Sequence, residues 1–292
     1  YADLATLLPQ RRQQLADIVD ALALESAQRQ LAACRVMASA LIDTAAMRRQ
    51  IPAEQFADEL RQKAFVRAFQ DEHRRHARRA VDDLLAVFAF RQDDAELADV
   101  PQLAGRWEDD LFNPELLVQA GKRLGLGAVI GAGVGAVADI ALAGLSLGAA
   151  TTLGATLGGA ASGGWRPLWR KLENRLAGVQ ELTVDDAVLL LLADQLLALA
   201  RALAQRGHAA QQRVRVDAAA APVDDAAGAL RAVVRTLGAA RGHPRWERGA
   251  RDSLDDDERA QLREAVARQL AGLVGGPGAA GGSASAVHEF AP

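Results

Sequence analysis

Apolar side chains recur at helical spacing along most of the chain. In residues 15–42 they occupy every third or fourth position without an intervening glycine or proline, which predicts one long helix. A second long helix is predicted after Pro52, because proline fits a first helical turn and Glu54 favours the helix dipole. Its apolar positions continue to Phe88, and a break is expected near His73, where arginines cluster.

Further helices are predicted from start signals in the rest of the chain. Asn113, followed by a proline and a glutamate, is one such signal, and Thr183, followed by two aspartates, is another. Two last helices are expected near residues 224–240 and after Ser253, which can cap a first turn rich in aspartate. The residues beyond Val274 are mostly Gly, Ala, Ser and Pro without periodicity, so we expect a disordered tail there.

Together these elements predict an all-α fold, a helical bundle with a central glycine-zipper hairpin. The predicted regions are an N-terminal long-helix region at residues 1–112, the hairpin with its flanking helices at 113–180, a C-terminal helical region at 181–274 and the tail at 275–292.

The central segment is almost free of charge, since Asp139 is the one ionisable residue between Arg123 and Arg166. Glycines recur in it at every fourth position, and small residues at that spacing let two helix backbones approach closely, as helices in lipid do. The glycines of this pattern are Gly127, Gly131, Gly135, Gly144, Gly148, Gly154 and Gly158. They predict the glycine zipper.

The predicted hairpin helices, residues 124–143 and 146–165, each have about the 20 apolar residues that a membrane span requires. Gly144 and Leu145 are expected to form the turn between them. The flanking residues suit the cytoplasmic interface of a membrane and are Lys122, Arg123, Trp165, Arg166, Trp169, Arg170 and Lys171. Because Asp139 would cost about 2.5–3.5 kcal/mol at mid-helix in lipid, insertion or reversible association is favoured over spanning. The alternative is a hairpin buried in a soluble bundle.

The apolar run at residues 184–200 is interpreted differently. Asp185, Asp186 and Asp194 lie in or beside it, and its length is at the lower bound for a membrane span. It therefore predicts a fully buried helix of the bundle.

The composition supports packed helices, because 50% of the residues are apolar and only 4% are aromatic. The formal net charge of -3 provides no general cationic field, so nucleic acid is not an expected partner. The single cysteine, Cys34, excludes an internal disulfide. Since Cys34 falls on an apolar helix stripe, we interpret it as a buried structural thiol.

Two histidines three residues apart, His73 and His76, follow Glu72 on a predicted helix and could contribute to a metal site. Four arginines crowd this stretch with positive charge, so a solvated basic face is the favoured interpretation and no metal is expected. These arginines are candidates for contact with a partner or with anionic lipid and are Arg74, Arg75, Arg78 and Arg79.

No motif brings an acid, a base and a nucleophile together, so the segment is not expected to be an enzyme. A phosphate-binding loop is missing as well, because Gly121-Lys122 lacks the earlier glycine and is followed by arginine. No cofactor is therefore expected within the segment.

Three stretches carry a family resemblance: the opening Tyr1-Ala2-Asp3-Leu4 with Leu7-Leu8-Pro9, the glycine run at residues 131–149, and Gly163-Gly164-Trp165. In this order they resemble a bacterial family in which a helical region of unknown function follows a small GTPase domain of the Era/TrmE type. The resemblance covers roughly residues 1–274, and the glycine run is its most specific part.

The resemblance implies a membrane-interacting accessory or effector domain of a bacterial P-loop GTPase. We expect the chain, which begins at Tyr1, to be a piece of a longer protein whose upstream GTPase domain is its partner and alone binds GTP and magnesium. The implied location is cytoplasmic, peripheral to or hairpin-inserted in the inner membrane, and a homo-oligomer is a further expected partner. The alternative is a soluble scaffold or oligomerisation module with the hairpin in its core or in a dimer interface.

Overall fold

The computed structural model of the chain describes residues 11–90, 111–113, 117, 145–146, 179–205, 224–247 and 257–274. Its elements in chain order are α2 (Arg12–Ala46), β1 (Arg48–Pro52), α3 (Ala53–Phe56), α4 (Glu59–Val87), β2 (Leu145–Ser146), β3 (Val179–Val184), α11 (Asp186–Gln205), α12 (Asp224–Leu237), the 3-10 helices η4 (Gly238–Gly242) and η5 (Pro244–Trp246), and α13 (Asp257–Val274). Long helices make up most of this part of the chain, so the predicted all-α class is confirmed.

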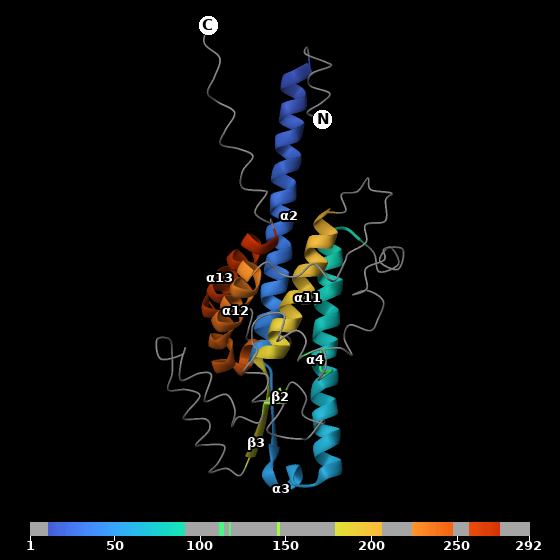
Figure 1. The fold of residues 1–292 in the computed structure, drawn as a ribbon, viewed down its shortest axis with the longest axis vertical. Helices are drawn as coiled ribbons and strands as arrows, with labels where there is room; N and C mark the ends of the chain where they lie inside the picture. The colour runs from blue at the N-terminus through green and yellow to red at the C-terminus, as the bar shows by residue number, and fades with distance from the viewer. Residues whose placement is uncertain are drawn as a thin grey trace.

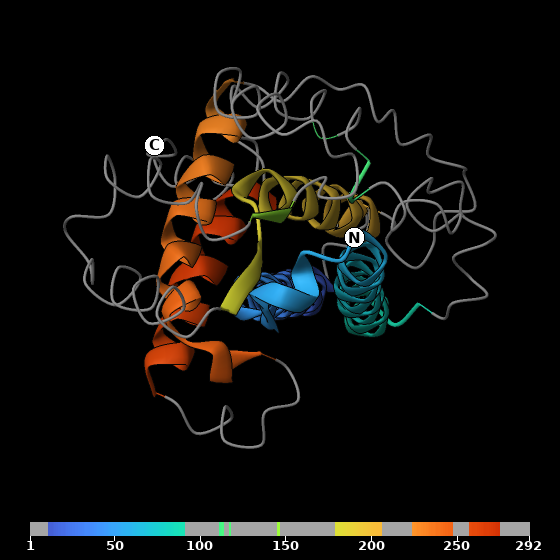
Figure 2. The same ribbon diagram turned by 90° about the horizontal axis from the view of Figure 1, so that it is seen from below.

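The second half of α2 is the centre of the bundle. It packs against α13, α4 and α11, and α12 lies beside α13 and α11 (Figures 1 and 2). One hydrophobic core joins all five helices, and Met37, Leu84, Leu189, Leu230 and Leu270 contribute to it from each in turn. Elements from before and after the glycine segment therefore share one core, while the predicted region boundaries stay predictions.

The first half of α2 projects beyond the bundle (Figure 1). Residues 11–28 are exposed except for Leu15, which is half-buried, whereas the helix is largely buried from Ala33 onward. The sequence predicts one helix here, but its apolar pattern does not reveal where the neighbouring helices end. Only the tertiary structure divides α2 into a packed half and a projecting half.

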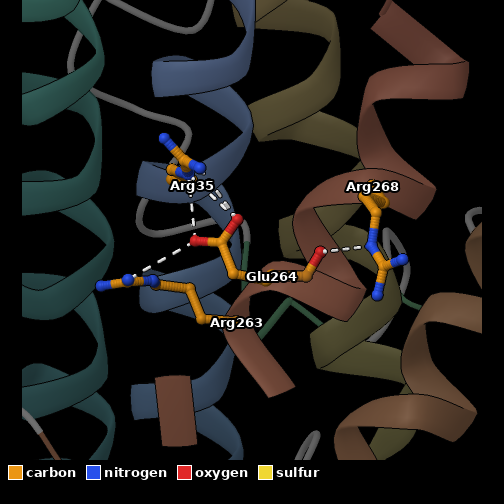
Figure 3. A network of polar contacts seen from close by, with 4 residues as sticks. All are labelled: Arg35, Arg263, Glu264 and Arg268. Atoms are coloured by element: carbon orange, nitrogen blue, oxygen red, sulfur yellow. Dashed lines mark hydrogen bonds and ion pairs between the residues drawn. The ribbon is translucent and has the colours of Figure 1, made fainter. Parts of the chain in front are cut away.

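An exposed ion pair connects α2 and α13. The guanidinium of Arg35 donates from Nε and Nη2 to the carboxylate of Glu264 at 3.0–3.1 Å, and Arg263 reaches the same carboxylate (Figure 3). Arg35 holds the pKa of Glu264 below its ordinary value. Because both side chains are substantially exposed to solvent, this pair contributes little to stability.

The predicted break of the second helix at His73 is wrong, because α4 runs through His73 without interruption. The break lies earlier, between α3 and α4, at Ala57 and Asp58. The Asp58 side chain accepts from the backbone N–H groups of Leu60 and Arg61 and so caps α4. An apolar face that packs on the core holds the helix together past the arginines.

A small antiparallel sheet was not predicted. Its strand order is β1-β3-β2, with Arg48 to Pro52 opposite Thr183 to Val179. Thr183 therefore lies in a strand rather than at a helix start, and α11 begins only at Asp186. Pro52 is tolerated because β1 is an edge strand, where a missing backbone donor does not break the ladder.

Strand β2 lies where the sequence predicts the hairpin turn and the start of its second helix. Leu145 pairs with Val184 and Ser146 with Thr183, so the middle of the glycine segment is attached to β3. The prediction is wrong at these two residues, since the free edge of β3 offers backbone partners that a turn lacks.

Candidate functional site

The arginine face, defined as Arg74, Arg75, Arg78 and Arg79, lies on α4 opposite its buried side. Arg75, Arg78 and Arg79 are exposed, as predicted. Arg74 is partly covered: it bonds to Asp71 at 2.6 Å and lies 5.7 Å from the centre of the Phe112 ring. Three of the four arginines are therefore exposed, and the predicted role of the arginine face in binding lipid or a partner stays a prediction.

The interpretation of His73 and His76 as part of a solvated face is wrong. Both rings point into the bundle and are 3% and 9% exposed. His73 meets Phe69 edge-to-face at 4.6 Å between ring centres, and both of its ring nitrogens are buried without a hydrogen-bond partner. Both histidines belong to the apolar side of α4. Residues of this side and of the arginine face are interleaved in the sequence, although the two faces lie on opposite sides of the helix.

Burial, together with the smaller effects of the nearby His76 and Arg49, lowers the pKa of His73 to about 3. The ring is therefore neutral in the folded protein at ordinary pH. In the unfolded chain it protonates near the ordinary value of about 6.5.

This difference predicts acid sensitivity that depends on His73. Between about pH 6.5 and pH 3 the unfolded chain binds a proton that the folded protein does not, so stability falls as the pH is lowered through that window. Above pH 6.5 the ring is neutral in both states and contributes no pH dependence. Chemical unfolding of the wild type and of His73→Leu at pH 7, 6, 5 and 4 measures the effect.

The wild type should lose up to about 1.4 kcal/mol per pH unit relative to His73→Leu in this window. Parallel stability curves for the two proteins over the same pH range would contradict the assignment.

Arg49 of β1 connects three separate elements. It pairs with Glu72 of α4, and its Nη2 and Nη1 atoms donate to both oxygens of Glu247, just after η5, at 2.6 and 2.8 Å. The bonds to Glu247 and Glu72 raise the pKa of Arg49 against the opposing effect of burial. The guanidinium is therefore held as a charged fork between two carboxylates.

Glu72, His76 and Glu247 are also the one group of metal-ligating side chains found among the described residues. Their ligand atoms lie within 4.8 Å of one another, and a histidine with two carboxylates suits a divalent cation. However, both carboxylates are already bonded to Arg49. A metal would have to displace that guanidinium, so we assign the cluster an ion-pairing role.

A second polar group is more deeply buried. Nη2 of Arg259 on α13 lies 2.6 Å from Oδ1 of Asp43 on α2, with side chains 12% and 5% exposed. Nε of Arg259 also donates to the backbone oxygen of Trp246 at 3.4 Å. One arginine therefore connects α2, η5 and α13.

No sequence pattern predicted a role for Arg49, Glu247, Arg259 or Asp43. The one signal was Asp43, a carboxylate inside an apolar helix stripe, which indicates a buried partner. By contrast, the interpretation of Cys34 is confirmed: it is buried, and burial raises the pKa of its thiol to about 11.

Most of the predicted hairpin sites lie outside the described residues. These are Gly127, Gly131, Gly135, Gly144, Gly148, Gly154, Gly158, Asp139, Lys122, Arg123, Trp165, Arg166, Trp169, Arg170 and Lys171. The glycine zipper and its interfacial flanks stay predictions.

The apolar run predicted as a buried bundle helix is α11. By length and composition, Asp186–Ala204 is the one helix in the described part of the chain that could cross a membrane, but 67% of the apolar stretch within it is buried. Leu189, Leu196 and Leu199 are each at most 1% exposed. A helix that is apolar all round is expected at the centre of a bundle.

Comparison with known proteins gives one result. A sequence model of one protein family matches residues 1–268, and the family is described as a domain of unknown function (DUF3482). No curated protein and no solved structure matches the chain.

Proposed function

From the premise that this chain belongs to the family described as domain of unknown function (DUF3482), we propose that it is an accessory module of a bacterial P-loop GTPase. In this proposal the module associates reversibly with the membrane through residues 124–165. The family description assigns no activity, so the proposal draws on the physical character of this segment and on its attachment to the bundle. The GTPase context rests on the sequence resemblance alone.

The position of the segment in the chain supports the proposal. It lies between α4 and β3, which both belong to the folded body. Residues 124–165 contain a single ionisable residue, Asp139, and are bounded by basic residues and tryptophan. An apolar segment inserted in the chain between two elements of a folded bundle can move without dismantling the helices on either side of it.

The observation that carries the proposal is the pairing of β2 with β3. Among the described residues of the segment, Leu145 and Ser146 pair with β3 through backbone hydrogen bonds. Each such bond contributes about 0.5–1.5 kcal/mol net. In this proposal the paired state is the retracted state of the module, and release of β2 breaks these bonds.

The burial of α11 favours residues 124–165 over α11 as the membrane-associating segment of this proposal. The apolar side chains of α11 are engaged in the core, so exposing them to lipid would unfold the bundle. The glycine segment is attached to the described body through β2 at its middle.

A soluble scaffold is the second candidate, and the same β2–β3 pairing favours it. If that pairing is permanent, residues 124–165 stay on the bundle and cover part of it. The two candidates therefore differ in a single property, which is whether β2 leaves β3.

A reversible disulfide between β2 and β3 separates the candidates. Ser146 and Thr183 are direct antiparallel partners, and such pairs have Cα atoms about 4.5–5.5 Å apart, within the range a disulfide spans. The variant is Ser146→Cys with Thr183→Cys. Cys34 is buried with a raised thiol pKa, so it will not compete for the bond.

The measurement is flotation of the full chain with liposomes that contain anionic lipid. The oxidised variant should float about tenfold less than the reduced variant, which corresponds to about 1.4 kcal/mol. The two single-cysteine variants are the controls and should float like the wild type under both conditions. Equal flotation of the oxidised and reduced forms would reject the release of β2, and absence of flotation in all forms would leave the soluble scaffold.

A further inference from the structure

The projecting half of α2 carries an apolar stripe, defined as Leu15, Ile18, Val19 and Leu22. These positions fall on one face of the helix, because helical neighbours are three and four residues apart. Ile18, Val19 and Leu22 are 43%, 38% and 47% exposed, and Leu15 is half-buried. Such a face in water is a candidate for contact with another helix.

The stripe continues the face with which α2 packs into its own bundle. Ala33 and Met37 follow on the same side of the helix, 11 and 15 residues after Leu22, and both are fully buried. On this side of α2, Ser26 and Arg29 lie between the stripe and Ala33, and the helix runs on past the ends of its neighbours (Figure 1). A further helix laid on the stripe would lie in line with the helices already packed on that side of α2.

The projecting half has little to stabilise it by itself. Its first turn has no acidic residue, and Arg11 at its N-cap makes no side-chain capping bond. Isolated helices of this length are marginal in water and gain most of their stability from packing of an apolar face.

The order of side chains in the stripe indicates which helix fits. In chain order the stripe is Leu, Ile, Val, Leu. Reversed, it is Leu, Val, Ile, Leu, so the two orders differ only in which of the two central β-branched residues comes first. Rotation about an axis between Ile18 and Val19 brings Leu15 level with Leu22 of a second helix and Ile18 level with Val19. This is the self-complementary pattern of a twofold, isologous contact.

The charges beside the stripe agree with that pairing. Arg11 and Glu25 lie on the same edge of the stripe, and in an antiparallel pair each edge faces the same edge of the other helix. The rotation that aligns the leucines places Arg11 beside Glu25 of the second helix. Within one chain, Glu25 also pairs with Arg29.

We propose that the stripe on the projecting half of α2 is a homodimer interface, in which two copies of this chain pair α2 antiparallel about Ile18 and Val19. The occupant of the stripe is a second copy, and the opposite face of the helix, with Asp17 and Asp20, stays in solvent. The proposal concerns described residues outside the glycine segment, so it does not depend on the membrane association proposed above.

The first test is the mass of the full chain in detergent-free buffer, measured by sedimentation equilibrium over a range of concentrations. The wild type should approach twice the mass of one chain. Leu22→Glu should shift the midpoint of dimerisation at least tenfold to higher concentration, a loss of about 1.4 kcal/mol. Both Leu22 and the control residue Leu24 are exposed outside the bundle, so neither substitution should unfold it.

The matched control is Leu24→Glu, on the opposite face and 60% exposed, which should leave dimerisation unchanged. Arg11→Glu and Glu25→Arg should each weaken the dimer, and the combined exchange should recover at least half of the loss. A chain that stays monomeric at every concentration, or a Leu22→Glu variant that dimerises like the wild type, would overturn the proposal. A double exchange weaker than both single variants would overturn the antiparallel arrangement.

Discussion

Arg259→Met is expected to lower the free energy of unfolding by about 3–5 kcal/mol, because it leaves a buried carboxylate without its cation. That carboxylate is Asp43, whose side chain is 5% exposed and lies 2.6 Å from the Arg259 guanidinium. Equilibrium unfolding in urea, followed by far-ultraviolet circular dichroism, measures the change.

The matched control is Arg268→Met on the same helix. Arg268 is exposed, and among the described residues it donates to the backbone oxygen of Glu264, so its replacement should change stability by at most about 0.5 kcal/mol. If both methionine variants lose the same amount of stability, the ion pair does not have the role assigned to it.

A double variant separates the energy of the pair from the cost of an isolated charge. Removing both charges, with Asp43→Leu and Arg259→Met, should recover much of the loss seen with Arg259→Met alone. The reason is that two apolar side chains of similar volume need no desolvated partner. A double variant less stable than either single variant would indicate that packing, rather than charge, sets the effect.

Loss of the Asp43–Arg259 pair should affect several elements, because Arg259 contacts more than one of them. Arg259 joins α13 to α2 through Asp43 and to η5 through the Trp246 carbonyl. Arg49 in turn joins Glu247, the residue after η5, to β1 and α4. The two arginines therefore connect the C-terminal elements with the N-terminal helices.

Leu189→Ala in α11 is expected to cost about 2–5 kcal/mol, the range found when a fully buried leucine is truncated. Leu189 has no exposed surface and belongs to the core shared by the five long helices. The loss combines the apolar surface no longer buried with the cavity left behind. Thermal and urea unfolding of the full chain both measure it.

Leu60→Ala on α4 is the control, since that side chain is 81% exposed and should contribute no more than about 0.5 kcal/mol. The comparison also tests the assignment of α11 as a core helix. If α11 did not pack in the bundle, Leu189→Ala would change the free energy of unfolding as little as Leu60→Ala does. Equal stability of the two variants would therefore reject the bundle packing.

The periodicity of apolar residues predicted α2 and α4 because each helix buries one face, and that face recurs every three or four residues. The last two helices were expected near residues 224–240 and after Ser253, where a cap and aspartates in the first turn indicate a helix start. The apolar pattern also predicted that α11 is buried, since the apolar residues of α11 cover all sides. Local chemistry, however, misplaced two boundaries. Thr183 resembles a helix cap but lies in β3, and α4 is capped by Asp58.

The candidate sites were harder to predict, since a charged residue looks alike in sequence whether its partner is solvent or a distant side chain. Arg49 and Glu247 are 198 positions apart, and Asp43 and Arg259 are 216 apart. His73 and His76 were assigned to the surface because of neighbouring arginines, although helix geometry turns them inward.

By itself the sequence determined that the chain is helical, which side of each helix is apolar, and that residues 124–165 are nearly uncharged. These properties depend on spacing and composition, which are local. Only the tertiary structure decided that β2 pairs with β3, that two arginines link the C-terminal elements to the N-terminal helices, and that α2 extends past the ends of its neighbouring helices. Those outcomes depend on which distant segments meet, and no local pattern encodes where a neighbouring helix ends.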